Sequence, residues 1–114
     1  MKSNRKSSSV DHLPAFEQLV LLALLSLKDD TAYGMNIRTA LREHAGRDVS
    51  VPTVYSALDR LESKGLVSSQ LGEPTAERGG RAKRMFCVEP EGVRVLESAQ
   101  RTLKTMWQLG GLDQ

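Results

Sequence analysis

The segment spanning residues 19–27, LVLLALLSL, would be apolar on every side of a helix. One stripe at helical spacing contains Phe16, Leu19, Val20, Ala23, Leu24 and Leu27. The opposite side carries Leu21, Leu22 and Leu25. A helix that is apolar all round is buried on all sides, yet a chain of 114 residues supports only one small core. We therefore expect the second side to be covered by the C-terminal helix, by a second subunit, or by both.

Two other interpretations of this apolar run are not favoured. The run is far shorter than the ~20 residues that a membrane helix needs. A signal peptide would not have Asp11, Pro14 and Glu17 before its apolar core, and no cleavage pattern follows. The single cysteine, Cys87, excludes an internal disulfide, so we expect a cytoplasmic protein with Cys87 buried in a strand.

The spacing of apolar residues and cap residues predicts the order helix, helix, helix, strand, strand, helix. The predicted helices span residues 14–28, 33–45, 50–65 and 90–110, and the predicted strands span residues 66–71 and 84–89. Gly46 should end the second helix and Ser50 should cap the third. This is a mainly α fold with a small β-hairpin, in the layout of a winged helix-turn-helix with an added C-terminal helix.

The third predicted helix, in SVPTVYSALDRLESKGLV, has an outer face without bulky side chains. Such a helix is ~21 Å long and fits the ~12 Å wide major groove of DNA. Thr53 and Ser56 offer donors and acceptors of short reach, and Arg60 can fork onto a guanine or a phosphate. Asp59 is placed to orient Arg60, while Tyr55 can pack, donate to a phosphate, or do both. Taken alone, this pattern fits a helix face that only meets solvent better than a DNA-reading helix. The DNA-reading interpretation depends on the hairpin and the family resemblance described below.

The connector between the two predicted strands carries the second basic feature. In ERGGRAKR, four cations stand within seven residues around two glycines: Arg78, Arg81, Lys83 and Arg84. The glycines permit a tight turn that approaches a DNA backbone closely, and the cations can then reach phosphates or a minor groove. The net charge of the whole chain is only +2, so this local clustering matters more than the total.

Three segments of the chain resemble the PadR-type transcriptional regulators: FEQLVLLALLSLKDDTAYGMNIRTAL, VSVPTVYSALDRLESKGLV and GEPTAERGGRAKRMFCVEPEG. The resemblance covers residues 13–107 and is closest to the short branch with one C-terminal helix. It differs mildly at Pro52, where glycine is frequent, and at Met85 and Phe86, where paired aromatics are common.

The resemblance implies a homodimer held largely by the C-terminal helix, which binds double-stranded DNA at inverted-repeat operators and is usually a repressor. From its composition we expect residues 1–12 to be a disordered, basic and Ser-rich arm, and we expect residues 13–89 to be the DNA-binding domain. Residues 90–110 form the dimerisation helix, and residues 111–114 form a tail. Some relatives bind aromatic effectors between the subunits, which makes four residues candidates for an interface or a ligand cavity: Leu21, Leu103, Met106 and Trp107.

Other classes of function have less support from the sequence. No nucleophile–base pattern, phosphate-binding loop or metal-ligand cluster is present, so we expect neither an enzyme nor a cofactor. The alternative is a winged helix that contacts proteins without specific DNA binding. The basic, glycine-containing connector argues against that alternative.

Overall fold

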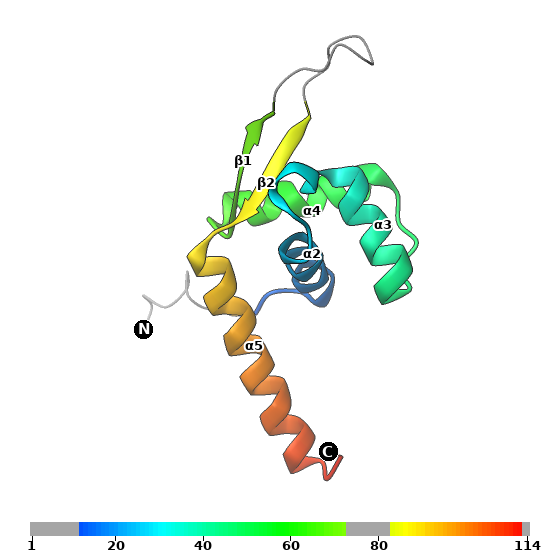
Figure 1. The fold of residues 1–114 in the computed structure, drawn as a ribbon. Coiled ribbons are helices and arrows are strands. Elements are labelled where there is room, and N and C mark those ends of the chain that lie inside the picture. Colours follow the sequence, from blue (N-terminus) through cyan, green and yellow to red (C-terminus); the bar gives the residue numbers. More distant parts are fainter. Residues whose placement is uncertain (1–11, 73–82, 113–114) are drawn as a thin grey trace.

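The computed structural model describes residues 12–72 and 83–112 (Figure 1). The helices are α2 (Ala15–Leu25), α3 (Gly34–Ala45), α4 (Val51–Ser63) and α5 (Pro90–Leu109), with a short 3-10 turn, η1 (Asp29–Thr31), between α2 and α3. The strands β1 (Val67–Leu71) and β2 (Arg84–Val88) pair as an antiparallel hairpin. The winged-helix class and the order of elements are confirmed. The arm predicted for residues 1–12 lies outside the described residues, except for residue 12.

The turn between α3 and α4 has the predicted caps. Gly46 ends α3 in the left-handed region at φ 65°, and its N–H donates to the carbonyl of Leu41. Ser50 precedes α4, and its hydroxyl accepts a 3.2 Å hydrogen bond from the N–H of Thr53. The first helix ends earlier than predicted, because Ser26 turns its hydroxyl back onto the carbonyl of Ala23 at 2.6 Å.

The hydrophobic core lies where α2, α3 and α4 meet, with β2 and the start of α5 completing it. Its fully buried side chains are Val20, Leu21, Ile37, Leu41, Val54, Leu58, Leu61, Leu66 and Val95. The assignment of Leu21 to the outer side of α2 was wrong, because Leu21 is 0% exposed. The side that faces away from the core carries Leu22 and Leu25, which are 51% and 49% exposed.

The two strands of the hairpin pair residue by residue along their whole length. Ser69 pairs with Phe86 and Leu71 with Arg84, and β2 also bridges to Tyr33 through Met85. Phe86 points into the core, and its N–H donates to the carbonyl of Ala32 at 2.9 Å. Since side chains alternate along a strand, Cys87 points outward and is exposed, so the expectation that it would be buried was wrong.

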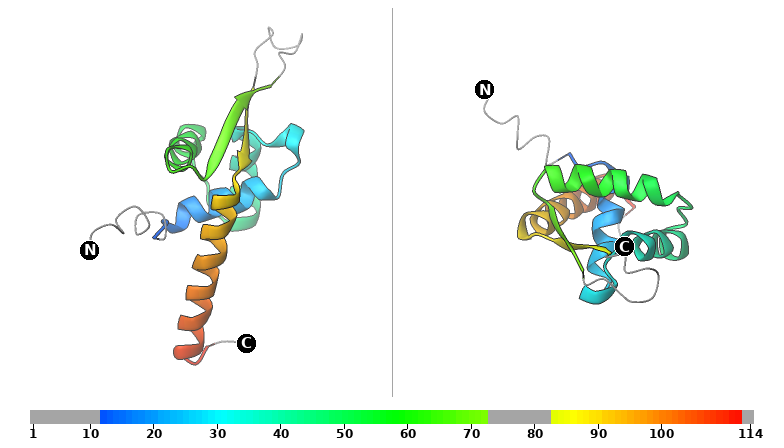
Figure 2. Two further views of the ribbon diagram at one scale, coloured as in Figure 1. Left: turned by 90° about the vertical axis from the view of Figure 1, so that its left-hand side faces the viewer. Right: turned by 90° about the horizontal axis from the view of Figure 1, so that it is seen from above.

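Helix α5 leaves the body of the fold after its first turns. Gly92 and Val95 are buried, whereas residues 101–112 are exposed throughout. Two views show α5 projecting from the helical body on the side away from the hairpin (Figures 1 and 2). No helix in the described ranges is long and apolar enough to cross a membrane. Because residues 101–112 are exposed, no other described part of the chain packs against the projecting half of α5, whose surface is amphipathic.

Candidate nucleic-acid interface

The outer face of α4 has the small side chains that the sequence predicted. Val54, Ala57, Leu58 and Leu61 are 0% exposed and anchor the helix in the core. Thr53 and Ser56 are exposed on the opposite side, and the hydroxyls of Ser50 and Thr53 lie 2.9 Å apart. A surface of this kind lets another molecule approach the backbone of the helix closely. Its hydroxyls can donate or accept hydrogen bonds.

Tyr55 is half-buried and lies between α4, α3 and β2. Its ring centroid is 6.0 Å from that of Phe86, with the rings inclined by 57°. The backbone of Gly34 passes so close to this ring that a Cβ there would lie 2.5 Å from its carbon atoms. Glycine at the start of α3 therefore makes room for Tyr55. The placement of the ring favours a packing role for Tyr55, and its hydroxyl remains a candidate for contact with DNA.

Arg60 leaves α4 on the same side as Ser56, and its side chain is 53% exposed. Its Nε donates to Oε2 of Glu17 at 2.7 Å, and Nζ of Lys64 donates to Oε1 of the same carboxylate at 3.0 Å. Burial raises the pKa of Glu17, but the hydrogen bonds and charges of Arg60 and Lys64 outweigh this effect and hold the pKa below its ordinary value. The expected partner of Arg60, Asp59, is not the one observed.

Asp59 instead belongs to a second ion-pair group that includes Arg84 of β2. The guanidinium of Arg84 lies 3.3 Å from Asp59 and 2.7 Å from Glu62, and its Nε donates to the hydroxyl of Ser69 at 3.2 Å. Ser69 in turn donates to the carboxylate of Glu62. Arg84 thus joins the connector end of the strand pair to α4, and its positive charge balances the two acidic side chains beside the outer face of α4.

Of the three other connector cations that the sequence predicts to contact DNA, the structure describes only Lys83. Arg78 and Arg81 lie outside the described residues. Lys83 is exposed where the connector enters β2, with its ammonium 4.4 Å from the ring centroid of Tyr33. This cation–π contact keeps Lys83 near the start of α3, while its charge stays accessible to solvent.

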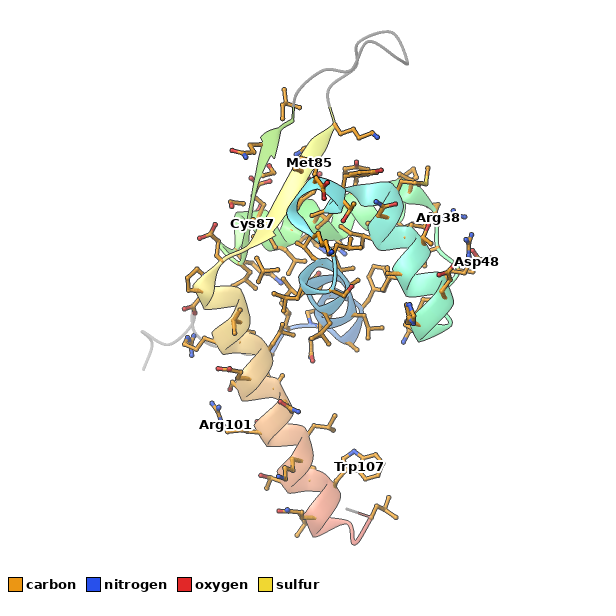
Figure 3. The ribbon with its side chains drawn as sticks, viewed as in Figure 1. Arg38, Asp48, Met85, Cys87, Arg101 and Trp107 are labelled. Atoms are coloured by element: carbon orange, nitrogen blue, oxygen red, sulfur yellow. The ribbon has the colours of Figure 1, made fainter. Side chains whose placement is uncertain are left out.

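Helix α3 and the turn before α4 bring further cations that the prediction had not included. Nε of Arg38 donates to the carbonyl of Val49 at 2.7 Å, and a terminal nitrogen lies 3.8 Å from Asp48 (Figure 3). Arg42 and Arg47 are exposed at the end of α3 and in the turn. The basic spacing in RTALREHAGR was a signal for these cations, whereas the hydrogen bond of Arg38 to the turn had no signature in the sequence.

The predicted interface candidates at the C-terminal helix fall on its projecting part. Leu103, Met106 and Trp107 are 59%, 54% and 46% exposed, and Trp107 lies near the free end of α5 (Figure 3). Leu21 does not join them, since it is enclosed in the core. The apolar residues of α5 therefore form no cavity with Leu21 within one chain.

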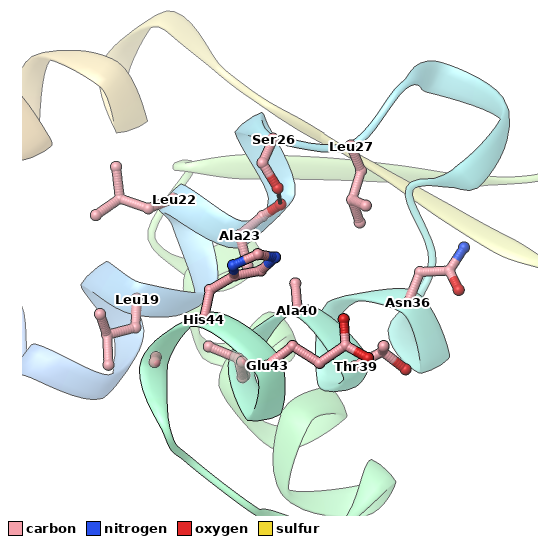
Figure 4. Close-up of a pocket in the computed structure, with 12 residues that line it drawn as sticks. Leu19, Leu22, Ala23, Ser26, Leu27, Asn36, Thr39, Ala40, Glu43 and His44 are labelled. Carbon is pink, nitrogen blue, oxygen red and sulfur yellow. Dashed lines mark hydrogen bonds between the residues drawn. The ribbon is translucent and has the colours of Figure 1, made fainter.

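A groove of about 630 Å³ runs between α2 and α3 (Figure 4). Leu19 and Leu22 line it from α2, and Ala40 and His44 line it from α3. It opens beside the exposed side of α2, on apolar side chains that the body of the fold leaves accessible. Within the described part of the chain, no group of three or more His, Cys, Asp or Glu side chains is arranged to hold a metal ion.

Comparison with known proteins gives one family model and several similar structures. The model described as the transcriptional regulator PadR-like family matches residues 21–98. An uncharacterised 37.1 kDa protein in transposon TN4556 of Streptomyces fradiae is 34% identical over 91 residues, which cover 80% of this chain and 24% of that protein. The chain therefore spans about a quarter of the length of this curated relative.

Among solved structures, a PadR family transcriptional regulator from Eggerthella lenta is 30% identical, with a TM-score of 0.65 over 92% of this chain and 88% of that one. A PadR-like transcription factor from Bacteroides fragilis has a TM-score of 0.70 over 96% and 97% of the two chains. Its 23% identity makes that second likeness one of fold alone. The family model and the Eggerthella lenta structure confirm the family resemblance that was stated from the sequence.

Proposed function

Since this chain belongs to the PadR-like family of transcriptional regulators, we propose that it binds double-stranded DNA sequence-specifically and regulates transcription. The observation that carries this proposal is the outer face of α4, where exposed Thr53 and Ser56 stand beside Arg60, whose side chain is about half exposed. Such a face admits the edges of base pairs in a major groove. In this proposal Thr53, Ser56 and Arg60 contact bases or nearby phosphates.

The hairpin supplies backbone contacts in this proposal. Lys83, together with Arg78 and Arg81, is proposed to contact phosphates on the flank of the groove that α4 enters. Arg84 contributes by a different route, because its guanidinium is held by Asp59 and Glu62. It fixes the angle between the hairpin and α4, so that base contacts and phosphate contacts fall in one register. Arg42 and Arg47 are additional candidates for phosphate contacts.

The active species in this proposal is a homodimer. Leu103, Met106 and Trp107 of α5 and Leu22 and Leu25 of α2 are large apolar side chains that lie exposed in the single chain, and exposed apolar side chains that cluster mark interaction sites. Pairing these surfaces across a two-fold axis buries them and sets two α4 helices one DNA turn apart, ~34 Å. The corresponding operator is an inverted repeat. By the family resemblance, its occupation represses transcription.

A small aromatic effector is the remaining element of the proposal. Trp107 offers a flat ring, and Leu103, Met106 and Leu22 offer apolar walls once two subunits meet. Such a ligand would change DNA affinity only through its different affinities for the DNA-competent and the DNA-incompetent dimer.

The test of DNA binding is a titration of a fluorescent random-sequence duplex with the full chain at several salt concentrations. We expect binding whose logarithmic salt slope is about −0.9 for each phosphate contact. A winged helix that contacts only proteins would show no binding to the duplex at any of these salt concentrations. That outcome would remove the proposed function.

A further inference from the structure

The carboxylate of Glu17 is buried, although it belongs to a residue type that is almost never buried without partners. Glu17 is 3% exposed and stands on α2 in the stripe that continues through Val20, Leu21 and Leu24 into the core. Its two oxygens hold two cations, Arg60 of α4 and Lys64, the residue that caps the end of α4. A charged group therefore occupies a core position, and its partners stand on the proposed DNA-reading helix and at its C-terminal cap.

The bond between Glu17 and Arg60 leaves part of the guanidinium for another partner. The described contact uses Nε of Arg60, at 2.7 Å from Oε2. A guanidinium carries further N–H donors on its two terminal nitrogens, and 53% of the Arg60 side chain is exposed. Thr53, Ser56 and Arg60 follow each other at helical spacing, so Arg60 leaves α4 on the side of these hydroxyls.

We propose that Glu17 is a positioning residue for DNA recognition, which holds Arg60 so that its terminal nitrogens meet a DNA molecule lying along α4. The inference rests on the proposed function. A free arginine loses much rotamer freedom when it binds, and a side chain held beforehand loses less. Packing in the core fixes the position of α2 and of the Glu17 carboxylate. The hydrogen bond from Arg60 to this carboxylate therefore restricts the rotamers of Arg60.

The charges of the cluster fit this role. One carboxylate faces two cations, so the group keeps a net positive charge toward a phosphate backbone. Lys64 is the more covered of the two cations, at 26% exposure of its side chain against 53% for Arg60. It therefore helps to neutralise the buried carboxylate, while Arg60 keeps the larger exposed part. Removal of Lys64 should leave the hydrogen bond between Glu17 and Arg60 in place.

An opposite role for Glu17 is neutralisation of the two cations, which would weaken their attraction to DNA. The two roles predict opposite changes in DNA affinity when the Glu17 carboxylate is removed. Glu17→Gln should weaken DNA binding if the carboxylate positions Arg60. It should strengthen binding if the carboxylate only withholds positive charge. The Glu17→Asp variant keeps the charge and shortens the side chain, so it separates position from charge.

The experiment measures the affinity of the full chain for the duplex that it recovers from a random DNA pool. The variants are Glu17→Gln, Arg60→Gln, their double variant and Lys64→Gln. We expect Glu17→Gln and Arg60→Gln each to weaken binding about tenfold, and the double variant to bind no more weakly than Arg60→Gln. Lys64→Gln, the matched control, should weaken binding less than about threefold. Unchanged or tighter binding by Glu17→Gln, or additive losses in the double variant, would overturn the inference.

Folding is monitored in the same series by circular dichroism melting. If Glu17→Gln is unfolded at the assay temperature, Glu17→Asp decides: a loss of about tenfold supports positioning, and wild-type affinity overturns it. Failure of the proposed function is recognised separately, because the wild-type chain would then bind no duplex at all. Binding by the wild-type chain together with full affinity in the Glu17 variants removes only the inference.

Discussion

A terminal nitrogen of Arg84 lies 2.7 Å from a carboxylate oxygen of Glu62, and this ion pair joins the hairpin to the proposed reading helix. The same guanidinium lies 3.3 Å from Asp59 and 4.9 Å from the ring centroid of Phe86. Because the hairpin has only two strands, it depends on such contacts for its angle to α4. Arg84 therefore serves to hold the hairpin against α4.

Replacing Arg84 should lower stability by a modest amount. Its side chain and that of Glu62 are 37% and 35% exposed, so solvent screens their attraction. Arg84→Gln is expected to reduce the free energy of unfolding by about 1 kcal/mol in urea titrations. Arg101→Gln, an exposed change on α5, is the control and should leave the midpoint unchanged. Equal midpoints for both variants would show that Arg84 does not hold the hairpin.

Gly34 should tolerate no side chain while Tyr55 keeps its position. A Cβ at residue 34 would lie 2.5 Å from ring carbons of Tyr55, so the ring must move. We expect Gly34→Ala to cost about 1–3 kcal/mol in chemical denaturation. Combining it with Tyr55→Ala should cost less than the sum of the two single changes, since the clash is then absent. Strictly additive costs would contradict this packing role.

The two regions of the proposed interface should respond differently to mutation. Arg81→Ala is expected to weaken binding to every duplex and to reduce the salt slope by about 0.9 for each phosphate that a subunit no longer binds. Ser56→Ala should instead alter the preferred sequence, at a cost of about 1–3 kcal/mol for a good base contact. Parallel selections on random DNA measure both effects. A uniform loss of affinity in both variants, with one unchanged preference, would disprove this division.

The exposed apolar face of α5 predicts a concentration-dependent assembly. We expect the wild-type chain to sediment as a dimer at micromolar concentration. Leu103→Glu should sediment as a folded monomer, because a charge would be buried at the proposed interface. Arg101→Gln serves again as a control on the same helix. A monomeric wild-type chain, or a Leu103→Glu variant that remains dimeric, would exclude this face.

The stability of the fold should depend on pH through Glu17. Burial raises the pKa of this carboxyl, but hydrogen bonds and charges from Arg60 and Lys64 bring the pKa in the folded chain below the ordinary value of 4.5. A lowered folded pKa stabilises the fold above the ordinary value, and the gain is lost as the pH falls through the folded pKa. The stability difference between the wild-type chain and Glu17→Gln should therefore shrink below about pH 4.5. A difference that stays constant from pH 7 to pH 3 would exclude the linkage.

The fold could be predicted from the sequence because its boundaries are encoded locally. Gly46 and Ser50 specify the turn between two helices through their own backbone and side-chain geometry. The rotation of α2 could not be predicted in this way. Leucines surround that helix, so hydrophobic periodicity gave no reason to place Leu21 in the core and Leu22 in solvent. The stripe that includes Glu17 faces inward, and a buried glutamate runs against the usual hydrophobic rule.

The candidate site could be predicted in its residue types and less well in its contacts. Thr53 and Ser56 are exposed on α4, as the pattern of the helix indicated. The partner of Arg60, however, stands 43 residues earlier in the chain, and no local spacing encodes such a pairing. The neighbouring Asp59 was the natural choice by sequence distance, yet β2 brings Arg84 to it instead.

Selection from a pool of random duplex DNA by the full chain tests the central claim most directly. We expect the recovered sequences to share an inverted repeat whose half-sites are centred about one helical turn apart, with two chains bound to each duplex. Sequencing the recovered pool and measuring the mass of the complex give both quantities. Recovered sequences without any common motif, or a single chain on an asymmetric site, would contradict the claim.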